Sequence, residues 1–187
     1  MKVVAGALPR VVLIEPRLFP DQRGYFLETY QARRYAEHGL AMPFVQDNLS
    51  FSRRGVVRGL HYQLRQPQGK LVMVLHGEIL DAVVDIRPDS PTFKQWTLNT
   101  LSGSNHRQLY VPPGYAHGFL VLSDTATVLY KVTDFYQPGD EYGVLWNDPD
   151  LGIPWPQAEA LLSAKDAALP RLGDIPAALL PTWAAAP

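Results

Sequence analysis

The sequence predicts an all-β fold, a sandwich or barrel of short strands joined by turns, with a few short helices. Glycine and proline, 14 and 17 residues respectively, are spread evenly and divide the chain into short pieces. The pieces between them are rich in β-branched and aromatic residues, which is the pattern of strands bounded by turns. Hydrophobic residues make up 47% of the 187 positions, enough to build a packed core.

The expected strands follow one another along most of the chain. Turn residues separate several of them, as in Asp89-Ser90-Pro91 and Val111-Pro112-Pro113-Gly114. Two segments indicate helices: Gln31–His38, which Gly39 would close as a C-cap, and a second near Ala158–Asp166. We expect strands at Val11–Glu15, Gly24–Thr29, Phe44–Ser50, Val56–Leu64, Lys70–His76, Glu78–Ile86, Lys94–Leu101, Gln108–Val111, Ala116–Leu122, Thr127–Thr133 and Gly143–Trp146.

The chain shows no internal repeat and no linker, so we expect residues 1–187 to form a single domain. The tail after Pro170 is rich in alanine and proline. We expect that tail to be loose.

Composition excludes several classes of function. The formal net charge of −1 gives no whole-protein field for nucleic acid or a membrane surface, so we expect neither partner. The absence of cysteine excludes disulfides, zinc-thiolate sites and thiol nucleophiles. The N-terminus lacks the apolar run of a signal peptide, and no apolar stretch reaches about 18 residues. We therefore expect a cytoplasmic protein.

One stretch concentrates polar side chains in a segment that otherwise looks like a buried strand. It holds Arg58, His61 and Gln63, and Lys70 opens the next strand. Burying these groups without partners would be costly, which favours a pocket over the simpler interpretation of a structural histidine. Arg58 and His61 have opposite parity along a strand, so a bulge at Gly59 would be needed to aim both inward.

Three further segments supply candidate groups to such a pocket. The turn at Pro112–Gly114 leads into a strand that would carry His117 inward. Tyr130 lies on the apolar face of its strand, where it either packs in the core or offers its hydroxyl as a general acid. Asp81 and Asp85 share the parity of apolar neighbours, so one of them is expected to orient a histidine.

These segments resemble the two motifs of the cupin superfamily, whose fold is a double-stranded β-helix, or jelly-roll barrel. The spacing of Gly55 and His61 and the six residues between Lys70 and Gly77 fit the first motif. Gln63 and Lys70 occupy positions where that motif has a second histidine and a glutamate. An ammonium repels a divalent cation and glutamine is a poor ligand, so we expect no metal. The same argument disfavours a metal-dependent cupin oxygenase or isomerase.

Longer motifs, in order along the chain, narrow the resemblance. From about Val11 to Asp166 the chain resembles the dTDP-4-dehydrorhamnose 3,5-epimerase family. That resemblance implies a jelly-roll homodimer that needs no metal and no cofactor. It would convert dTDP-4-dehydro-6-deoxy-α-D-glucose into dTDP-4-dehydro-β-L-rhamnose, for the activated rhamnose of bacterial surface polysaccharide such as the O antigen of lipopolysaccharide. The motifs are Asp21-x-Arg23-Gly24, Gln46-Asp47-Asn48, Arg58-Gly59-Leu60-His61-Tyr62-Gln63, Gln68-Gly69-Lys70, Asp81–Arg87, Pro113–Phe119, Tyr130-Lys131-x-Thr133-Asp134 and Trp146-Asn147-Asp148-Pro149.

The resemblance also implies roles for particular residues. His61 would be the base, Tyr130 the acid on the opposite face of the sugar, and Lys70 the cation that stabilises the enolate oxygen. Asp166 would be the partner of the catalytic histidine. The implied substrate contacts are Arg58 and His117 for the sugar pocket, and Arg23, Glu28, Gln46, Asp47, Asn48, Glu141 and Lys165 for the nucleotide and pyrophosphate. Some of these would reach across the dimer on exchanged N-terminal strands.

Two departures and two alternatives accompany this prediction. Met73 stands where many relatives carry a basic residue, and beyond Asp166 the sequence drifts from the family pattern. An epimerase that acts at one carbon only, as in antibiotic deoxysugars, would carry the same His61, Lys70 and Tyr130. A non-catalytic module that binds a sugar nucleotide is the third possibility, and it would show no solvent exchange at C3 or C5.

Overall fold

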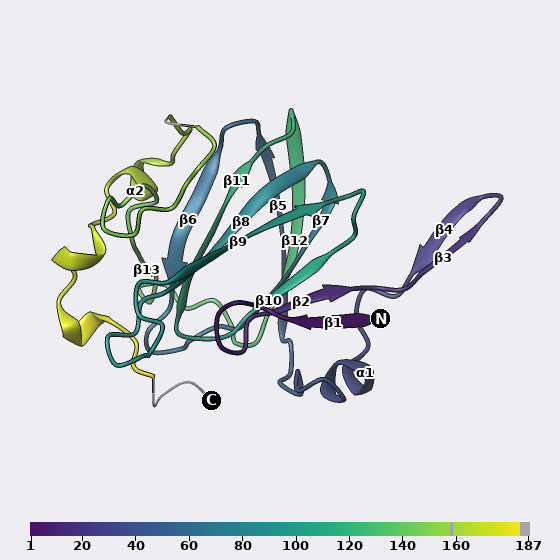
Figure 1. Ribbon diagram of the computed structural model, residues 1–187, viewed down its shortest axis with the longest axis horizontal. Coiled ribbons are helices and arrows are strands. Elements are labelled where there is room, and N and C mark those ends of the chain that lie inside the picture. Colours follow the sequence, from purple (N-terminus) through teal and green to yellow (C-terminus); the bar gives the residue numbers. More distant parts are fainter. Residues whose placement is uncertain (158, 184–187) are drawn as a thin grey trace.

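Two antiparallel β-sheets face each other across a shared apolar core (Figure 1). The computed structural model describes residues 1–157 and 159–183. One sheet has six strands in the order β1-β2-β10-β7-β12-β5, and the other has five in the order β13-β6-β11-β8-β9. This arrangement confirms the predicted jelly roll. Strand bounds are β1 Lys2–Ala5, β2 Val12–Glu15, β3 Leu18–Asp21, β4 Gly24–Leu27, β5 Gln46–Arg53, β6 Val57–Tyr62, β7 Lys70–His76, β8 Glu78–Asp85, β9 Trp96–Ser102, β10 Gln108–Val111, β11 Tyr115–Val121, β12 Thr125–Val132 and β13 Tyr142–Gly143.

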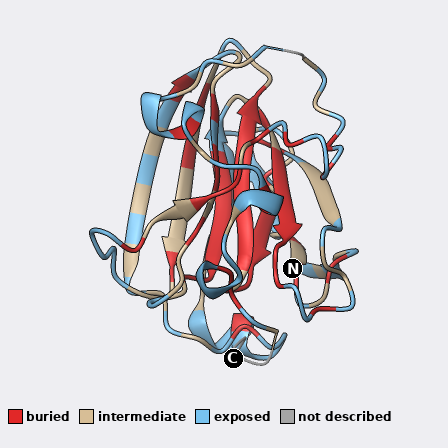
Figure 2. Ribbon diagram, turned by 90° about the vertical axis from the view of Figure 1, so that its left-hand side faces the viewer, coloured by how far each residue is buried: buried red, intermediate tan, exposed pale blue. Residues whose placement is uncertain are grey.

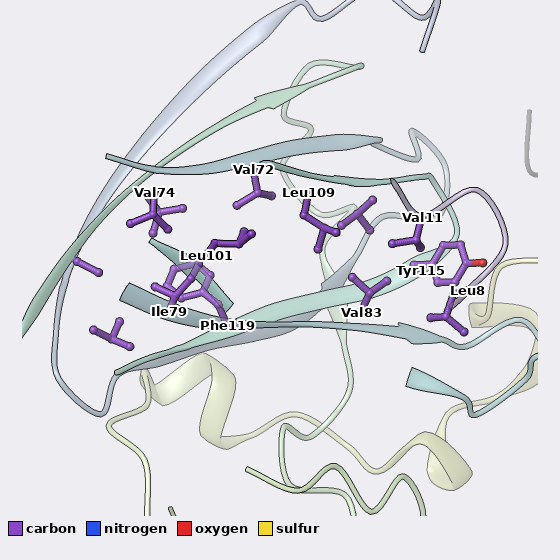
Figure 3. Close-up of a cluster of buried hydrophobic side chains, with 14 residues drawn as sticks. Leu8, Val11, Val72, Val74, Ile79, Val83, Leu101, Leu109, Tyr115 and Phe119 are labelled. Atoms are coloured by element: carbon purple, nitrogen blue, oxygen red, sulfur yellow. The ribbon is translucent and has the colours of Figure 1, made fainter. Parts of the chain in front are cut away.

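The core lies between the sheets and is built from the inward side chains of alternating residues. Figure 3 shows Val72 and Val74 of β7 across from Ile79 and Val83 of β8, and Phe119 of β11 lies with them. Most of the residues of these central strands are buried (Figure 2). Because β-strands place successive side chains on opposite faces, the same strands also present groups away from this core.

Two strands, β1 and β3, were not predicted from the sequence. β1 pairs with β2 along Lys2–Ala5, at the edge of the six-stranded sheet. β3 pairs with β4 in a separate two-stranded hairpin, and Pro20 within β3 is tolerated because the hairpin has no further neighbour. The hairpin projects away from the sheets (Figure 1). Its Phe26 is 68% exposed.

The predicted strand Gly143–Trp146 is wrong beyond its first residue. Only Tyr142–Gly143 forms β13, which pairs with Tyr62 and His61 of β6. Val144 still exchanges two backbone hydrogen bonds with Leu60 of β6. The chain turns away after Val144, and the Leu145 amide donates to the carbonyl of Pro170.

The first predicted helix is confirmed and the second is wrong in its extent. Helix α1 spans Ala32–Ala36, and Gly39, at φ +83°, donates its amide to the carbonyl of Ala36. Helix α2 spans only Ala164–Ala167, and Ala158 lies outside the described residues. Leu161 instead forms a bridge to Val56, and Ser163 caps α2, so the chain becomes helical only after that residue.

The outer faces of the two sheets are covered in part by α1 and by the C-terminal segment. Tyr35 of α1 packs with Ile14, Leu71 and Tyr110 on the six-stranded sheet.

Within the described residues, no helix has the length and apolar character needed to span a bilayer.

The tail after Pro170 was expected to be loose, and that is wrong for residues 171–183. Leu172 and Leu180, in and beside the short 3-10 turns η1 (Leu172–Asp174) and η2 (Ala177–Leu179), are buried against the outer face of the five-stranded sheet. Trp183 stacks on the buried guanidinium of Arg87. Residues 184–187 lie outside the described part of the chain.

Candidate active site

A cavity of about 500 Å³ opens between the two sheets, and the predicted polar groups meet there. Strands β5, β7 and β12 form one wall, and β6 and β11 form the other. Its lining comprises Gln46, Asn48, Ser50, Arg58, His61, Gln63, Gln68, Lys70, Val72, His117, Gly118, Phe119, Val128, Tyr130, Tyr136, Glu141, Ser163, Lys165 and Asp166.

A bulge in β6 brings both Arg58 and His61 to this cavity, as predicted. His117 of β11 pairs with His61, whereas Phe119 pairs with Arg58, so β6 carries one extra residue between the two pairs. The strands approach so closely here that a Cβ on Gly59 would lie 2.6 Å from the His117 carbonyl oxygen. Gly59 also has φ +114°, which L side chains rarely adopt. Glycine therefore makes the bulge possible.

Asp166 holds the imidazole of His61. Nε2 of His61 lies 2.5 Å from Oδ1 of Asp166, although the two residues are far apart in sequence. Ser163 caps the short helix α2 by accepting the Asp166 amide, which fixes the carboxylate against β6. Burial alone would raise the pKa of Asp166, but the hydrogen bond and charge of His61 and the Ser163 hydroxyl outweigh burial and lower it. Asp166 is therefore an anion that accepts a hydrogen bond from Nε2 of His61.

A second histidine–carboxylate pair lies deeper. Nε2 of His117 is 3.0 and 2.8 Å from the two carboxylate oxygens of Asp81, which is fully buried on β8. Burial raises the pKa of Asp81, and the neighbouring His117 opposes that rise. The parity argument that one of Asp81 and Asp85 would orient a histidine is confirmed.

Lys70 is a buried cation at the start of β7. It is 7% exposed, and its Nζ donates to Oε1 of Gln63 over 2.9 Å. Burial lowers the pKa of Lys70 to about 8, against the opposing charges of Glu141 and Asp81. The ammonium is therefore present at neutral pH although the side chain is buried.

Tyr130 reaches the cavity from β12 with its ring packed on the apolar core. Burial raises the pKa of Tyr130, Arg58 opposes the rise, and Glu141 adds to it. Its hydroxyl therefore keeps its proton at neutral pH and can donate it.

Polar residues surround the outer part of the cavity. Glu141 accepts hydrogen bonds from Lys165 Nζ at 2.6 Å and from the Tyr136 hydroxyl at 3.1 Å. Gln46 donates to Oδ1 of Asn48 at 2.8 Å and accepts from the Tyr136 amide at 3.0 Å. Among the described residues, no group of three His, Cys, Asp or Glu side chains is placed to hold a metal ion.

Comparison with known proteins decides the family. A sequence model described as dTDP-4-dehydrorhamnose 3,5-epimerase matches residues 5–174. The chain belongs to this family. A dTDP-4-dehydrorhamnose 3,5-epimerase of Pseudomonas aeruginosa is 54% identical over 89% of this chain and 93% of its own. The family's members named here are epimerases, so the chain is an isomerase.

Solved structures agree with that assignment. The crystal structure of dTDP-6-deoxy-D-glucose-3,5-epimerase from Legionella pneumophila, in complex with dTDP-4-keto-L-rhamnose, is 49% identical. It superposes with a TM-score of 0.94 over 97% of this chain and 98% of its own. A 4-keto-6-deoxy sugar epimerase from the novobiocin gene cluster of Streptomyces spheroides is 38% identical, with a TM-score of 0.95 over 100% of this chain and 96% of its own.

Three residues that the family resemblance implied as substrate contacts lie away from the cavity lining in the described chain. Arg23 is at the tip of the β3–β4 hairpin and pairs with Asp21. Glu28 pairs with Arg34 of α1. Asp47 points to the outer face of β5, where it pairs with Lys131, because only the even-numbered neighbours Gln46 and Asn48 face the cavity. Within one copy of the chain these three therefore form no part of the epimerase pocket.

The structure also adds residues that sequence reasoning missed. Ser50 continues the alternation of Gln46 and Asn48, so the parity of β5 was a usable signal. Tyr136 and Ser163 come from irregular segments, where no periodic pattern marks the inward side chains. Gln68 belongs to a motif quoted for the resemblance, but its side chain donates to the Asp134 carbonyl in the cavity wall.

Proposed function

We propose that this pocket converts dTDP-4-dehydro-6-deoxy-α-D-glucose into dTDP-4-dehydro-β-L-rhamnose by inverting C3 and C5. One observation carries the proposal: the His61–Asp166 pair, the buried Lys70 and the Tyr130 hydroxyl all face one cavity. The names of the 54% identical relative and of the Legionella complex support the same substrate class.

His61 is proposed as the base. The Asp166 carboxylate accepts a hydrogen bond from Nε2–H, so the lone pair of the neutral ring is on Nδ1. The C4 ketone of the substrate acidifies the hydrogens on both neighbouring carbons, C3 and C5. When Nδ1 takes one of these protons, the ring becomes an imidazolium and Asp166 stabilises its charge at 2.5 Å.

Lys70 is proposed to stabilise the negative charge that develops on the C4 oxygen. Its ammonium is fixed in a buried site, where electrostatic stabilisation is stronger than in water. The substrate ketone already supplies the electron sink, so the proposed steps use no cofactor.

Tyr130 is proposed as the acid that returns a proton. It approaches the cavity from β12 in one sheet, whereas His61 approaches from β6 in the other. Base and acid on different walls can serve opposite faces of the sugar ring, which inversion requires. Six further residues line the cavity. Of these, Arg58 and His117 are proposed to contact the sugar, and Gln46, Asn48, Glu141 and Lys165 the nucleotide and pyrophosphate.

We propose that the chain is a homodimer joined through the outer face of the six-stranded sheet. Odd-numbered residues of β5 point outward there, and Leu49 and Phe51 are 64% and 61% exposed. Leu49 pairs across the sheet with Leu129, and Leu129 pairs with Met73. Such an apolar sheet face is typical of an interface between subunits. The projecting β3–β4 hairpin would then carry Arg23 toward the partner's pocket.

Light scattering after gel filtration tests the dimer. Leu49→Lys should shift the mass from dimer to monomer, because it buries a charge in the interface. Leu161→Lys is the matched control, since Leu161 is 60% exposed but lies outside β5. A dimeric Leu49→Lys protein would contradict this interface.

A cytoplasmic location and a role in surface polysaccharide such as O antigen remain predictions.

His61→Ala tests the proposed chemistry. This substitution should abolish formation of the inverted sugar, as monitored by proton NMR. Binding of dTDP, measured by calorimetry, should be nearly unchanged. Full turnover by this variant would remove His61 as the base. A product inverted at one carbon only in the wild type would favour the alternative of a single-carbon epimerase.

A further inference from the structure

We infer that Gln63 is a positioning residue that holds the Lys70 ammonium toward the substrate oxygen, an inference that rests on the function proposed above. The two side chains meet at 2.9 Å in the cavity wall. Lys70 is the first residue of β7, and Gln63 directly follows β6, so the contact joins the two sheets across the pocket.

The orientation of the Gln63 amide follows from the chemistry of its partner. An ammonium has three donors and no acceptor, so only the amide oxygen of Gln63 can face it. This is the hydrogen bond that Nζ makes among the described residues. The other donors of Nζ are therefore available for the C4 oxygen of a substrate. Without Gln63 the flexible four-carbon stem could place the charge elsewhere in the cavity.

The loop between Gln63 and Lys70 is anchored near both ends. The buried carboxylate of Asp140 accepts the backbone amides of Arg65, at 3.1 and 3.0 Å, and Gln66, at 2.8 Å. At the other end, the Gly69 amide donates to the Thr133 hydroxyl at 2.8 Å. A fixed backbone on both sides of the loop keeps the Gln63–Lys70 distance constant.

A neutral amide suits this position better than a carboxylate. Two acidic groups already act on Lys70 through their charge, Glu141 and the buried Asp81 of β8. A third carboxylate, in direct contact, would cancel the positive charge that the enolate needs. The other titratable groups around the cavity are Arg58 and His61 of β6, His117 of β11, Tyr130 of β12, Tyr136, and Lys165 and Asp166 of α2.

Three substitutions separate positioning from packing. Gln63→Leu keeps most of the volume but removes the acceptor. Gln63→Asn keeps the amide but shortens its reach. Gln63→Glu keeps the geometry and adds a charge. The first two should lower kcat roughly ten-fold or more, the scale of a hydrogen bond to a charged group, with a smaller effect on KM.

A purely structural role for Gln63 would leave the titration of Lys70 unchanged. That titration can be monitored by NMR of the labelled lysine side chains. Resonances are assigned by their loss in Lys70→Met. Loss of the acceptor in Gln63→Leu disfavours the cation, so Lys70 should titrate at lower pH than in the wild type. The carboxylate of Gln63→Glu favours the cation, so Lys70 should titrate at higher pH, by roughly one pH unit in each direction. Gln66→Leu and Gln66→Glu, on the exposed part of the same loop, should change nothing.

The outcomes distinguish the two levels of the account. If Lys70 titrates as in the wild type in both Gln63→Leu and Gln63→Glu, the positioning role is overturned, even if kcat falls. If Lys70 responds as expected but the wild-type protein shows no epimerisation, the contact stands and the proposed function fails. Gln63→Asn repeats the first measurement should Gln63→Leu not fold.

Discussion

Replacing Asp166 by asparagine should slow catalysis about a thousand-fold. The structure places the carboxylate 2.5 Å from Nε2 of His61, with the carboxylate buried and the imidazole partly open to the cavity. With the charge centres about 4 Å apart and an effective dielectric constant of about 20, the carboxylate stabilises the imidazolium by about 4 kcal/mol. At about 1.4 kcal/mol for each factor of ten, this energy corresponds to roughly 10³ in rate.

The amide in Asp166→Asn has a second effect in the same direction. Its NH₂ group can donate to Nε2, which would favour the tautomer whose proton is on Nδ1, the atom proposed as the base. The loss should fall on kcat, because Asp166 contacts His61 and is not among the residues proposed to bind dTDP.

Initial rates from proton NMR, with calorimetric binding of dTDP, measure this prediction. Asp174→Asn is the control, because Asp174 is an exposed carboxylate in the same C-terminal segment. Asp166→Asn with a rate within a few-fold of wild type, normal binding and intact folding would refute the reasoning.

Three further substitutions test other parts of the account. Lys70→Met should lower kcat roughly 100-fold or more, as expected for the loss of one oxyanion contact, and an unchanged rate would remove Lys70 from the mechanism. Because the cation is the active form and burial lowers the pKa of Lys70 to about 8, wild-type kcat should fall as pH rises through about 8; a flat profile there would count against this. Tyr130→Phe should slow or redirect reprotonation with little change in the melting temperature, whereas wild-type behaviour at both carbons would make Tyr130 a packing residue. Asp85→Ala leaves the buried guanidinium of Arg87 without the carboxylate that now accepts its hydrogen bonds at 2.8 Å. The free energy of unfolding, measured with urea, should fall by about 3–5 kcal/mol, and a fall below about 1 kcal/mol would contradict this.

Regular alternation is what made most of the fold and site predictable. The period-2 pattern located the central strands, and it placed Tyr130 and Asp81 on inward faces correctly. The conflict in parity between Arg58 and His61 pointed to a bulge at Gly59, and the register shift in β6 confirms it.

Contacts made by irregular segments were beyond pattern reasoning. Asp166 reaches His61 from a four-residue helix late in the chain, and the family resemblance alone suggested that pairing. The buried tail was missed because Leu172 and Leu180 follow no helical or strand period. Their burial depends on the outer face of a sheet formed by distant residues, which is tertiary information.

The central claim is that one pocket inverts both C3 and C5. Its most direct test is proton NMR of dTDP-4-dehydro-6-deoxyglucose with the wild-type protein in D₂O, without added metal. The account predicts that deuterium enters at both C3 and C5, and that neither site exchanges with His61→Ala. Exchange at one carbon only, or none, in the wild type would contradict it.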